Sequence, residues 1–424
     1  MKEYLFRNAR IIDPGRNIDS IGDLGVSDGR IAATEKLKAP EVMDLKGKVL
    51  SPGFIDLHVH LRQPGNTQAE TIATGTAAAA AGGFTSIVAM PNTTPAADNA
   101  GAIEFLRQNA AAQGVVRVLP CGNMTKEGKG EEMAGIGALK SAGVVALSDD
   151  GRCIQDHALM RHVVEYAKSF GLPILDHCED NQLAANGVMN EGKWSVLLGM
   201  RGISGASEEL MIARNIILAR QIDWHIHMQH VSVKESVELL RAARAKGIKV
   251  SGEATPHHLA LTDECIKKYD TNYKMNPPLR SESDRQALIE GVADGTISAI
   301  ATDHAPHTRT AKEVEFDSAP FGIVGLETAL PVSYTVLVGG GAVSLPRLIE
   351  LFTAGPARIL MMKNYDLSEG AAADLTVIDP NAEYVVDMNT FRTKSRNTPF
   401  HGMRVQCRPV LTMVGGKIVY QYRG

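Results

Sequence analysis

The chain has 424 residues, of which 44% are hydrophobic and 22% charged, a balance typical of a globular protein with a large core. Its formal net charge is −4 and it has no lysine or arginine run, which argues against nucleic-acid binding. The N-terminus lacks a signal-like apolar segment, no stretch is apolar enough to span a bilayer, and five cysteines without a CxxC pair suit free thiols, so we expect a cytoplasmic protein.

Both ends of the chain predict a small β domain. Short alternating runs fill residues 1–51 and are separated by the turns DPG and SDG. Similar runs return in residues 373–424. Either end alone would enclose too little core, so we expect the two ends to pair into one discontinuous β-sandwich domain.

Residues 52–372 show a different pattern, in which short β-rich runs alternate with helical stretches. The candidate strands are 54–60, 84–90, 115–121, 143–148, 173–177, 224–230, 248–253 and 298–302. Repeated β/α units without a second series of strands favour a closed, TIM-like (β/α)₈ barrel over an open sheet. The longest weakly patterned connection, 304–322, predicts a functional loop.

The first barrel strand, in SPGFIDLHVHLRQPG, carries His58 and His60. Side chains two apart on a strand share a face, so both rings should point into the barrel near its C-terminal rim, with Arg62 continuing the row. Ile55, Leu57 and Val59 should face the helices. An HxH pair alone is equally consistent with metal ligands and with core histidines.

Other histidines and acids recur at the same place in the repeat. Strand four ends in Asp149 and Asp150, strand five is followed by His177, strand six by His230, and strand eight by Asp303. These ends meet at one face of a barrel, and His and Asp are ligands for divalent cations, so together they predict a metal site.

The remaining histidines fit other roles. His225 and His227 stand at odd separations from His230 and should be structural, on the opposite face. His157 and His162 lie on a helical stretch and should be at the surface. His257 and His258, in EATPHHL, stay open as groups behind the site.

At this point the sequence resembles a known family. The motifs PGFIDLHVHLRQPG, AMPNTTP, LSDDG, LDHCED, QHVS, EATPHHL, MNPPLR and ATDHAPHT together resemble the bacterial type I dihydroorotases of the amidohydrolase superfamily, over essentially the whole chain. The resemblance implies a distorted (β/α)₈ barrel that holds two zinc ions.

The resemblance also implies roles for individual residues. His58, His60 and Asp303 would hold one zinc, and His177 and His230 the other. Many relatives bridge the ions with a carboxylated lysine, which LSDDG lacks, so an aspartate would bridge; Asp150 is preferred to Asp149 because the family's bridging aspartate adjoins the glycine. Asp303 would also be the catalytic residue. The implied substrate contacts are His60, Leu61, Arg62, Asn92, Asn276, His307, Phe321 and Gly322, the last two through their main chain.

The implied activity is zinc-dependent, reversible hydrolysis of (S)-dihydroorotate to N-carbamoyl-L-aspartate, the third step of pyrimidine synthesis. The family also implies a homodimer and association with aspartate transcarbamoylase. Three alternatives stay open: an allantoinase or dihydropyrimidinase, a non-catalytic scaffold for aspartate transcarbamoylase, and an adventitious histidine site on a structural barrel. The sequence does not choose between zinc, cobalt and manganese.

Overall fold

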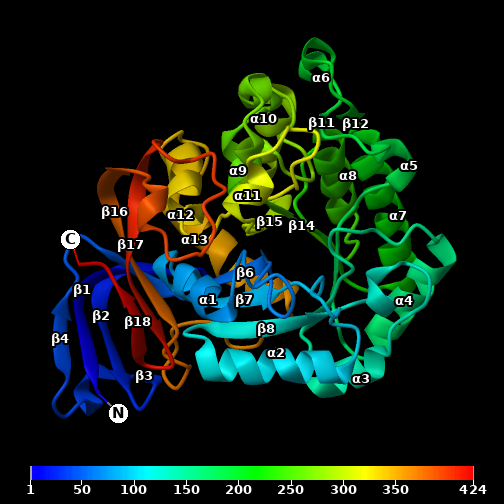
Figure 1. Cartoon of the computed structure of the whole chain (residues 1–424). Coiled ribbons are helices and arrows are strands. Elements are labelled where there is room, and N and C mark those ends of the chain that lie inside the picture. Colours follow the sequence, from blue (N-terminus) through cyan, green and yellow to red (C-terminus); the bar gives the residue numbers. More distant parts are fainter. Residues whose placement is uncertain (1, 424) are drawn as a thin grey trace.

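A sheet built from both ends of the chain stands beside a barrel in the computed structural model, which describes residues 2–423 (Figure 1). The sheet has eight strands in the order β18-β17-β16-β5-β1-β2-β3, with β4 also paired to β1. Its strands are β1 Tyr4–Asp13, β2 Ile18–Ser27, β3 Arg30–Ala32, β4 Glu41–Asp44, β5 Val49–Pro52, β16 Leu375–Val385, β17 Arg404–Val414 and β18 Lys417–Gln421. The predicted union of the two chain ends is confirmed, as one continuous sheet joined where β5 pairs with β16.

The second sheet contains eight parallel strands in the order β15-β14-β13-β10-β9-β8-β7-β6. They are β6 Phe54–Val59, β7 Phe84–Ala89, β8 Arg117–Gly122, β9 Ala146–Leu147, β10 Ile174–Asp176, β13 Ile226–Met228, β14 Val250–Ala254 and β15 Ile297–Ile300. Past β15 the chain reaches the first strand again, because Val59 bridges His304 and the His60 N–H donates to the His304 carbonyl at 2.9 Å. The predicted barrel is therefore confirmed, and every predicted strand overlaps an observed one.

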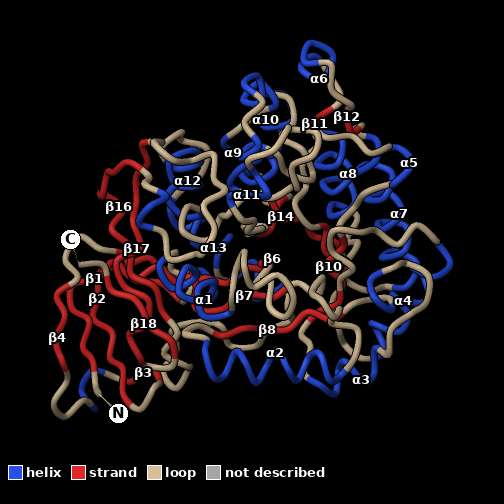
Figure 2. The backbone as a smooth tube through the Cα atoms, in the orientation of Figure 1, coloured by secondary structure: helices blue, strands red, loops and turns tan. Residues whose placement is uncertain are grey.

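Helices follow the strands and cover the outside of the barrel (Figure 2). The longer ones are α1 Ile72–Ala81, α2 Ala100–Gln113, α3 Ile136–Ala142, α4 His157–Ser169, α7 Ala206–Ile222, α8 Lys234–Ala245, α10 Glu282–Ala293 and α13 Leu345–Phe352. The shorter ones are α5 Asn181–Ala184, α6 Lys193–Leu198, α9 Pro256–Ala260, α11 Arg309–Lys312, α12 Ala329–Ser333 and α14 Ala354–Ile359, and a two-stranded sheet joins β11 Met189–Asn190 to β12 Gly202–Ile203. Their starts are set locally: Ser281, for example, accepts a hydrogen bond from the Asp284 N–H and caps α10.

Side-chain alternation along β6 is interrupted. The register of β6 against β7 shifts between Asp56 and Val59, as at a β-bulge. Ile55 and Leu57 pack in one cluster with residues of neighbouring strands, such as Val88 and Leu175, and with Ala357 and Ile359 of α14. Val59 instead joins the larger core cluster. Val59 thus lies apart from Ile55 and Leu57, although the sequence places all three on one face.

Three further sequence predictions concern the cysteines, membrane-spanning segments and the loop 304–322. All five cysteines are free. No helix within residues 2–423 combines the length and the apolar character that crossing a bilayer would need. The predicted loop 304–322 contains one short helix, α11, and is otherwise irregular.

Candidate metal centre

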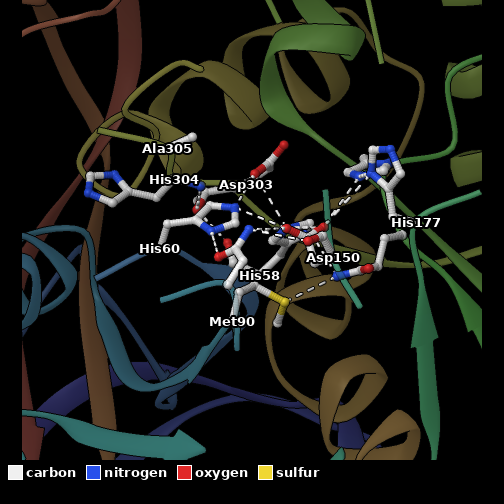
Figure 3. Close-up of polar contacts among 12 residues, drawn as sticks. His58, His60, Met90, Asp150, His177, Asp303, His304 and Ala305 are labelled. Atoms are coloured by element: carbon white, nitrogen blue, oxygen red, sulfur yellow. Dashed lines mark hydrogen bonds and ion pairs between the residues drawn. The ribbon is translucent and has the colours of Figure 1, made fainter. Parts of the chain in front are cut away.

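Six predicted ligands converge at the C-terminal ends of the barrel strands. Figure 3 labels five of them, His58, His60, Asp150, His177 and Asp303. The elements that carry them are β6 and the turn after it for His58 and His60, and the turns after β9, β10, β13 and β15 for Asp150, His177, His230 and Asp303. Each of the six is at most 6% exposed. Parallel strands bring these distant sequence positions together because all their C-terminal ends lie on one face.

Asp150 lies at the centre of the group. Its Oδ1 is 3.0 Å from His58 Nε2 and its Oδ2 is 3.4 Å from His60 Nε2. His177 Nδ1 and His230 Nε2 are each 3.9 Å from Asp150 Oδ1. Two possible ligand sets, one with His58 and His60 and one with His177 and His230, therefore share this carboxylate, and within each set the ligand atoms lie within 4.8 Å of one another.

The donor atoms fit divalent cations. His177 Nδ1 and His230 Nε2 point at each other across 2.9 Å, and the buried His58 Nε2 makes no hydrogen bond despite its approach to Asp150. Asp303 Oδ1 lies 3.1 Å from His60 Nε2 and 3.4 Å from His58 Nε2. Imidazole nitrogens and carboxylate oxygens clustered in this way are the ligands of zinc and similar ions.

The electrostatics favour a bound cation. Burial lowers the pKa of His58, but the carboxylates of Asp150 and Asp303 outweigh burial and raise it well above its ordinary value. Burial conversely raises the pKa of Asp150, and the surrounding histidines, His58 first, bring it well below its ordinary value. Burial and the nearby His177 lower the pKa of His230. The site thus keeps an ionised carboxylate among imidazoles, and a metal would replace the proton that His58 otherwise holds.

Asp149 has a separate structural role. Its Oδ1 accepts from the main-chain N–H groups of Met124 at 2.8 Å and Thr125 at 3.2 Å. Asp149 therefore holds the turn after β8, while Asp150 faces the histidines.

A buried carboxylate that the sequence did not single out stands behind the histidines. Glu253, on β14, lies 3.4 Å from His58 Nδ1, accepts from the His230 N–H at 3.3 Å, and lies 2.9 Å from His227 Nε2. Burial would raise the pKa of Glu253, but hydrogen bonds from His227 and His58 hold it at about 2. The only signal in the sequence was its position in EATPHHL, the motif of strand seven.

We predict that Glu253→Gln weakens metal binding by about ten- to a hundredfold, because an uncharged amide polarises the His58 ring less than a carboxylate does. Metal affinity measured by competition with a chelator checks this. Glu238→Gln, an exposed glutamate on α8, is the control. Equal affinities in the Glu253 variant and the wild type would contradict the prediction.

Other predicted histidines lie where the strand geometry alone did not place them. His227 Nε2 lies 2.9 Å from Glu253, which also accepts from the main-chain N–H of His230. His230 follows the end of β13 at Met228 and has a left-handed backbone with φ 29°. His230 belongs to the candidate ligand sets, whereas His227 contacts Glu253 and Ser251. His225 and His227 both hydrogen-bond Ser251 Oγ at 2.8 Å. His258 lies behind the site, 3.0 Å from the Pro277 carbonyl.

Arg62 reaches the rim of the site by a different route from the one predicted. β6 ends at Val59, and Arg62 has a left-handed φ of 55°, so it does not continue an alternating row. Its Nε donates to the Pro306 carbonyl at 3.2 Å and its Nη2 lies 3.5 Å from His307 Nε2. Burial lowers the pKa of Arg62, and the carboxylates of Asp303 and Asp150 act in the opposite direction.

The other predicted contacts divide into amide side chains and main chain. Asn92 Oδ1 lies 2.9 Å from His60 Nδ1, and its Nδ2 donates to Asp150 Oδ2 at 3.2 Å, so Asn92 orients two candidate ligands. Asn276 Oδ1 is buried without a hydrogen-bond partner in the described chain. The Leu61 side chain is in the core, which leaves only its main chain for a ligand.

His307 joins the rim to the predicted main-chain contacts. Its Nε2 donates to the Phe321 carbonyl at 2.7 Å. Gly322 has φ 151°, and a Cβ there would come within 2.6 Å of the Ala305 carbonyl oxygen, so the position requires glycine.

Comparison with known proteins gives a consistent picture. The family described as "Dihydro-orotase-like" matches residues 47–236, and the "Amidohydrolase family" matches 299–420. A dihydroorotase of Solibacter usitatus is 48% identical, over 97% of this chain and 96% of its own length. One of Pelotomaculum thermopropionicum is 47% identical over 99% of both chains. Among solved structures, L-hydantoinase from Arthrobacter aurescens superposes with a TM-score of 0.88 at 26% identity, covering 99% of this chain and 96% of that one.

Proposed function

This chain belongs to the dihydroorotase family of cyclic-amide hydrolases, and on that basis we propose that it interconverts (S)-dihydroorotate and N-carbamoyl-L-aspartate at two zinc ions bridged by Asp150. The observation that supports the two-ion site best is the pair of ligand sets that share Asp150. This activity fits a role in pyrimidine synthesis.

Each ligand set would hold one ion. His58, His60 and Asp303 would bind the first, His177 and His230 the second, and Asp150 both. The chemistry that the ions supply when bound is polarisation of the amide carbonyl and ionisation of water near neutral pH. Glu253 and Asn92 orient the ligands from behind.

Asp303 would carry the proton. Its carboxylate stands at the rim beside His60, where it can take a proton from the attacking water and deliver it to the ring nitrogen that leaves the carbonyl. In the biosynthetic direction the ureido nitrogen attacks the side-chain carboxylate carbon, and Asp303 would accept the ureido proton and deliver it to the carboxylate oxygen that leaves that carbon.

The carboxylate of the substrate that does not react needs a cation. Arg62 would supply it, with Asn92, Asn276 and His307 around the rim and the main chain of Phe321 and Gly322 on the far side. The Arg62 guanidinium lies beside His307 and feels the charges of Asp303 and Asp150.

We predict that Arg62→Met raises KM for dihydroorotate by about ten- to a hundredfold, because it removes a charge-assisted contact that substrate and transition state share. Steady-state kinetics in both directions check this. Arg309→Met, an exposed arginine of the loop paired only with Glu313, is the control. A loss confined to kcat would instead give Arg62 a role in the chemical step.

A substrate panel tests the proposed function itself. Dihydroorotate, allantoin and hydantoin are assayed with the zinc-loaded protein, and we expect turnover of dihydroorotate to dominate. Allantoinases and dihydropyrimidinases usually keep the bridging lysine, which the LSDDG segment lacks. Preference for hydantoin or allantoin would overturn the proposal, and binding of zinc without any turnover would favour the scaffold.

Assembly and location are proposed from family membership. We expect a homodimer in the cytoplasm, and light scattering measures the oligomeric state. We also expect association with aspartate transcarbamoylase, which co-purification tests. The metal content of protein purified without added metal distinguishes zinc from cobalt and manganese.

A further inference from the structure

Two lysines are buried beside the predicted main-chain contacts, Phe321 and Gly322. Lys312, the last residue of α11, is 5% exposed, and Lys274, just before the MNPPLR motif, is 2% exposed. Within residues 2–423, neither ammonium forms an ion pair with a carboxylate at 4.0 Å or less. Two buried cations without carboxylate partners are unusual, so the groups that do contact them are informative.

Lys312 holds three main-chain carbonyls. Its Nζ donates to the carbonyl oxygens of Pro320 at 3.0 Å, Gly322 at 3.1 Å and Lys274 at 3.5 Å. An ammonium has three N–H donors, so this set satisfies it completely. Two of the acceptors flank Phe321, and the third belongs to the neighbouring segment.

Lys274 holds the preceding part of the same loop. Its Nζ donates to the Phe316 carbonyl at 2.7 Å and the Asp317 carbonyl at 3.0 Å, and it lies 4.8 Å from the centre of the Phe321 ring. The two lysines therefore bind the segment 316–322 at both ends.

Most main-chain N–H and carbonyl groups of Phe321 and Gly322 form hydrogen bonds within the protein. The Gly322 N–H donates to the Lys274 carbonyl at 3.0 Å, and the Gly322 carbonyl also accepts from Asn397 Nδ2 at 3.0 Å. The Phe321 carbonyl accepts from His307. The Phe321 N–H, in contrast, makes no hydrogen bond to any group of the described chain. The Phe321 N–H is thus available to a ligand, while the Phe321 carbonyl and both main-chain groups of Gly322 are hydrogen-bonded within the protein.

We propose that Lys312 is a positioning residue that sets the Phe321 N–H for the substrate, by holding the carbonyls on either side of it. The proposal rests on the proposed function, in which this main chain contacts dihydroorotate. Removing the ammonium would leave the Pro320 carbonyl without its donor and loosen residues 320–322, while Lys274 still holds residues 316 and 317 and the candidate metal ligands stay in place.

The cost of burying the cation supports a role beyond filling space. Burial, with a smaller contribution from Lys274, lowers the pKa of Lys312 to about 7, and burial lowers that of Lys274 to about 8. An apolar side chain of similar length would fill the same volume without this cost. Such an apolar side chain could not donate hydrogen bonds to the three carbonyls.

The experiment compares Lys312→Met with Lys267→Met, the same substitution at an exposed lysine of the 263–268 segment. Hydrogen–deuterium exchange is followed in peptides covering 316–323, and kinetics are measured with dihydroorotate. We expect exchange of the Gly322 amide to become at least about tenfold faster, and KM to rise about tenfold with a smaller change in kcat. The metal content and the exchange of β15 should not change.

Exchange tests the positioning without any assumption about the substrate. Unchanged exchange in 316–323 overturns the inference, whichever cyclic amide the enzyme hydrolyses. Faster exchange and a lower melting temperature with an unchanged KM also overturn it, because Lys312 would then be only structural. A wild type that does not turn over dihydroorotate refutes the proposed function instead. If Lys312→Met does not fold, Lys312→Gln keeps two of the three N–H donors in an uncharged amide and should give the same changes at smaller size.

Discussion

Replacement of Asp303 by Asn should lower kcat for dihydroorotate by about a thousandfold, within the range that general acid–base catalysis contributes. Asp303 is 4% exposed, and its Oδ1 lies beside both His58 and His60. An amide can still offer an oxygen to a cation but cannot accept the proton, so the chemical step is lost while most of the metal site remains.

The measurement is therefore double: kcat at saturating zinc, and zinc content by elemental analysis. Asp223→Asn, at a carboxylate whose side chain is 69% exposed, controls for the substitution itself. If Asp303→Asn lost zinc in proportion to its activity, the residue would be a ligand only and the proton would have another acceptor.

Asp150→Ala should have the larger effect on the metal, because both ligand sets share this carboxylate. We expect the variant to lose activity and to retain at most one weakly bound ion. Removing the charge also removes the main cause of the raised pKa of His58 and leaves Asp303 and Glu253 to oppose burial. Zinc titration by calorimetry gives the stoichiometry and the affinity together.

The adjacent Asp149 offers a matched comparison. Asp149→Asn should lower the melting temperature, since Asp149 accepts several hydrogen bonds from residues 123–125, but should leave the zinc stoichiometry intact. The reverse outcome, with zinc lost from the Asp149 variant and retained by the Asp150 variant, would exchange the roles of the two aspartates.

The barrel and the convergence of the candidate ligands follow from simple rules. His177 and Asp303 are distant in sequence, yet each follows a short apolar run, and the ends of parallel barrel strands meet at one face. No knowledge of loop structure is needed for this step. The choice of Asp150 over Asp149 came instead from family resemblance, because both follow the same strand.

What could not be predicted depends on local departures from regular strands. The bulge in β6 and the left-handed residues Arg62 and His230 change which side each side chain takes, so parity arguments failed beyond the strand ends. The role of Glu253 could not be predicted from the sequence, because its partners lie on other strands. Nothing in the sequence singles out Lys312, and only the folded chain shows that carbonyls from two segments surround it.

The join between the two chain ends has a consequence for synthesis. β5 pairs with β1 on one side and with β16 on the other, so this edge of the N-terminal strands stays open until the residues from Leu375 onward have left the ribosome. An open edge is a template for pairing with another chain. All the candidate metal ligands are made before that edge can close, so a nascent chain can complete its barrel while its oldest strands are still prone to aggregation.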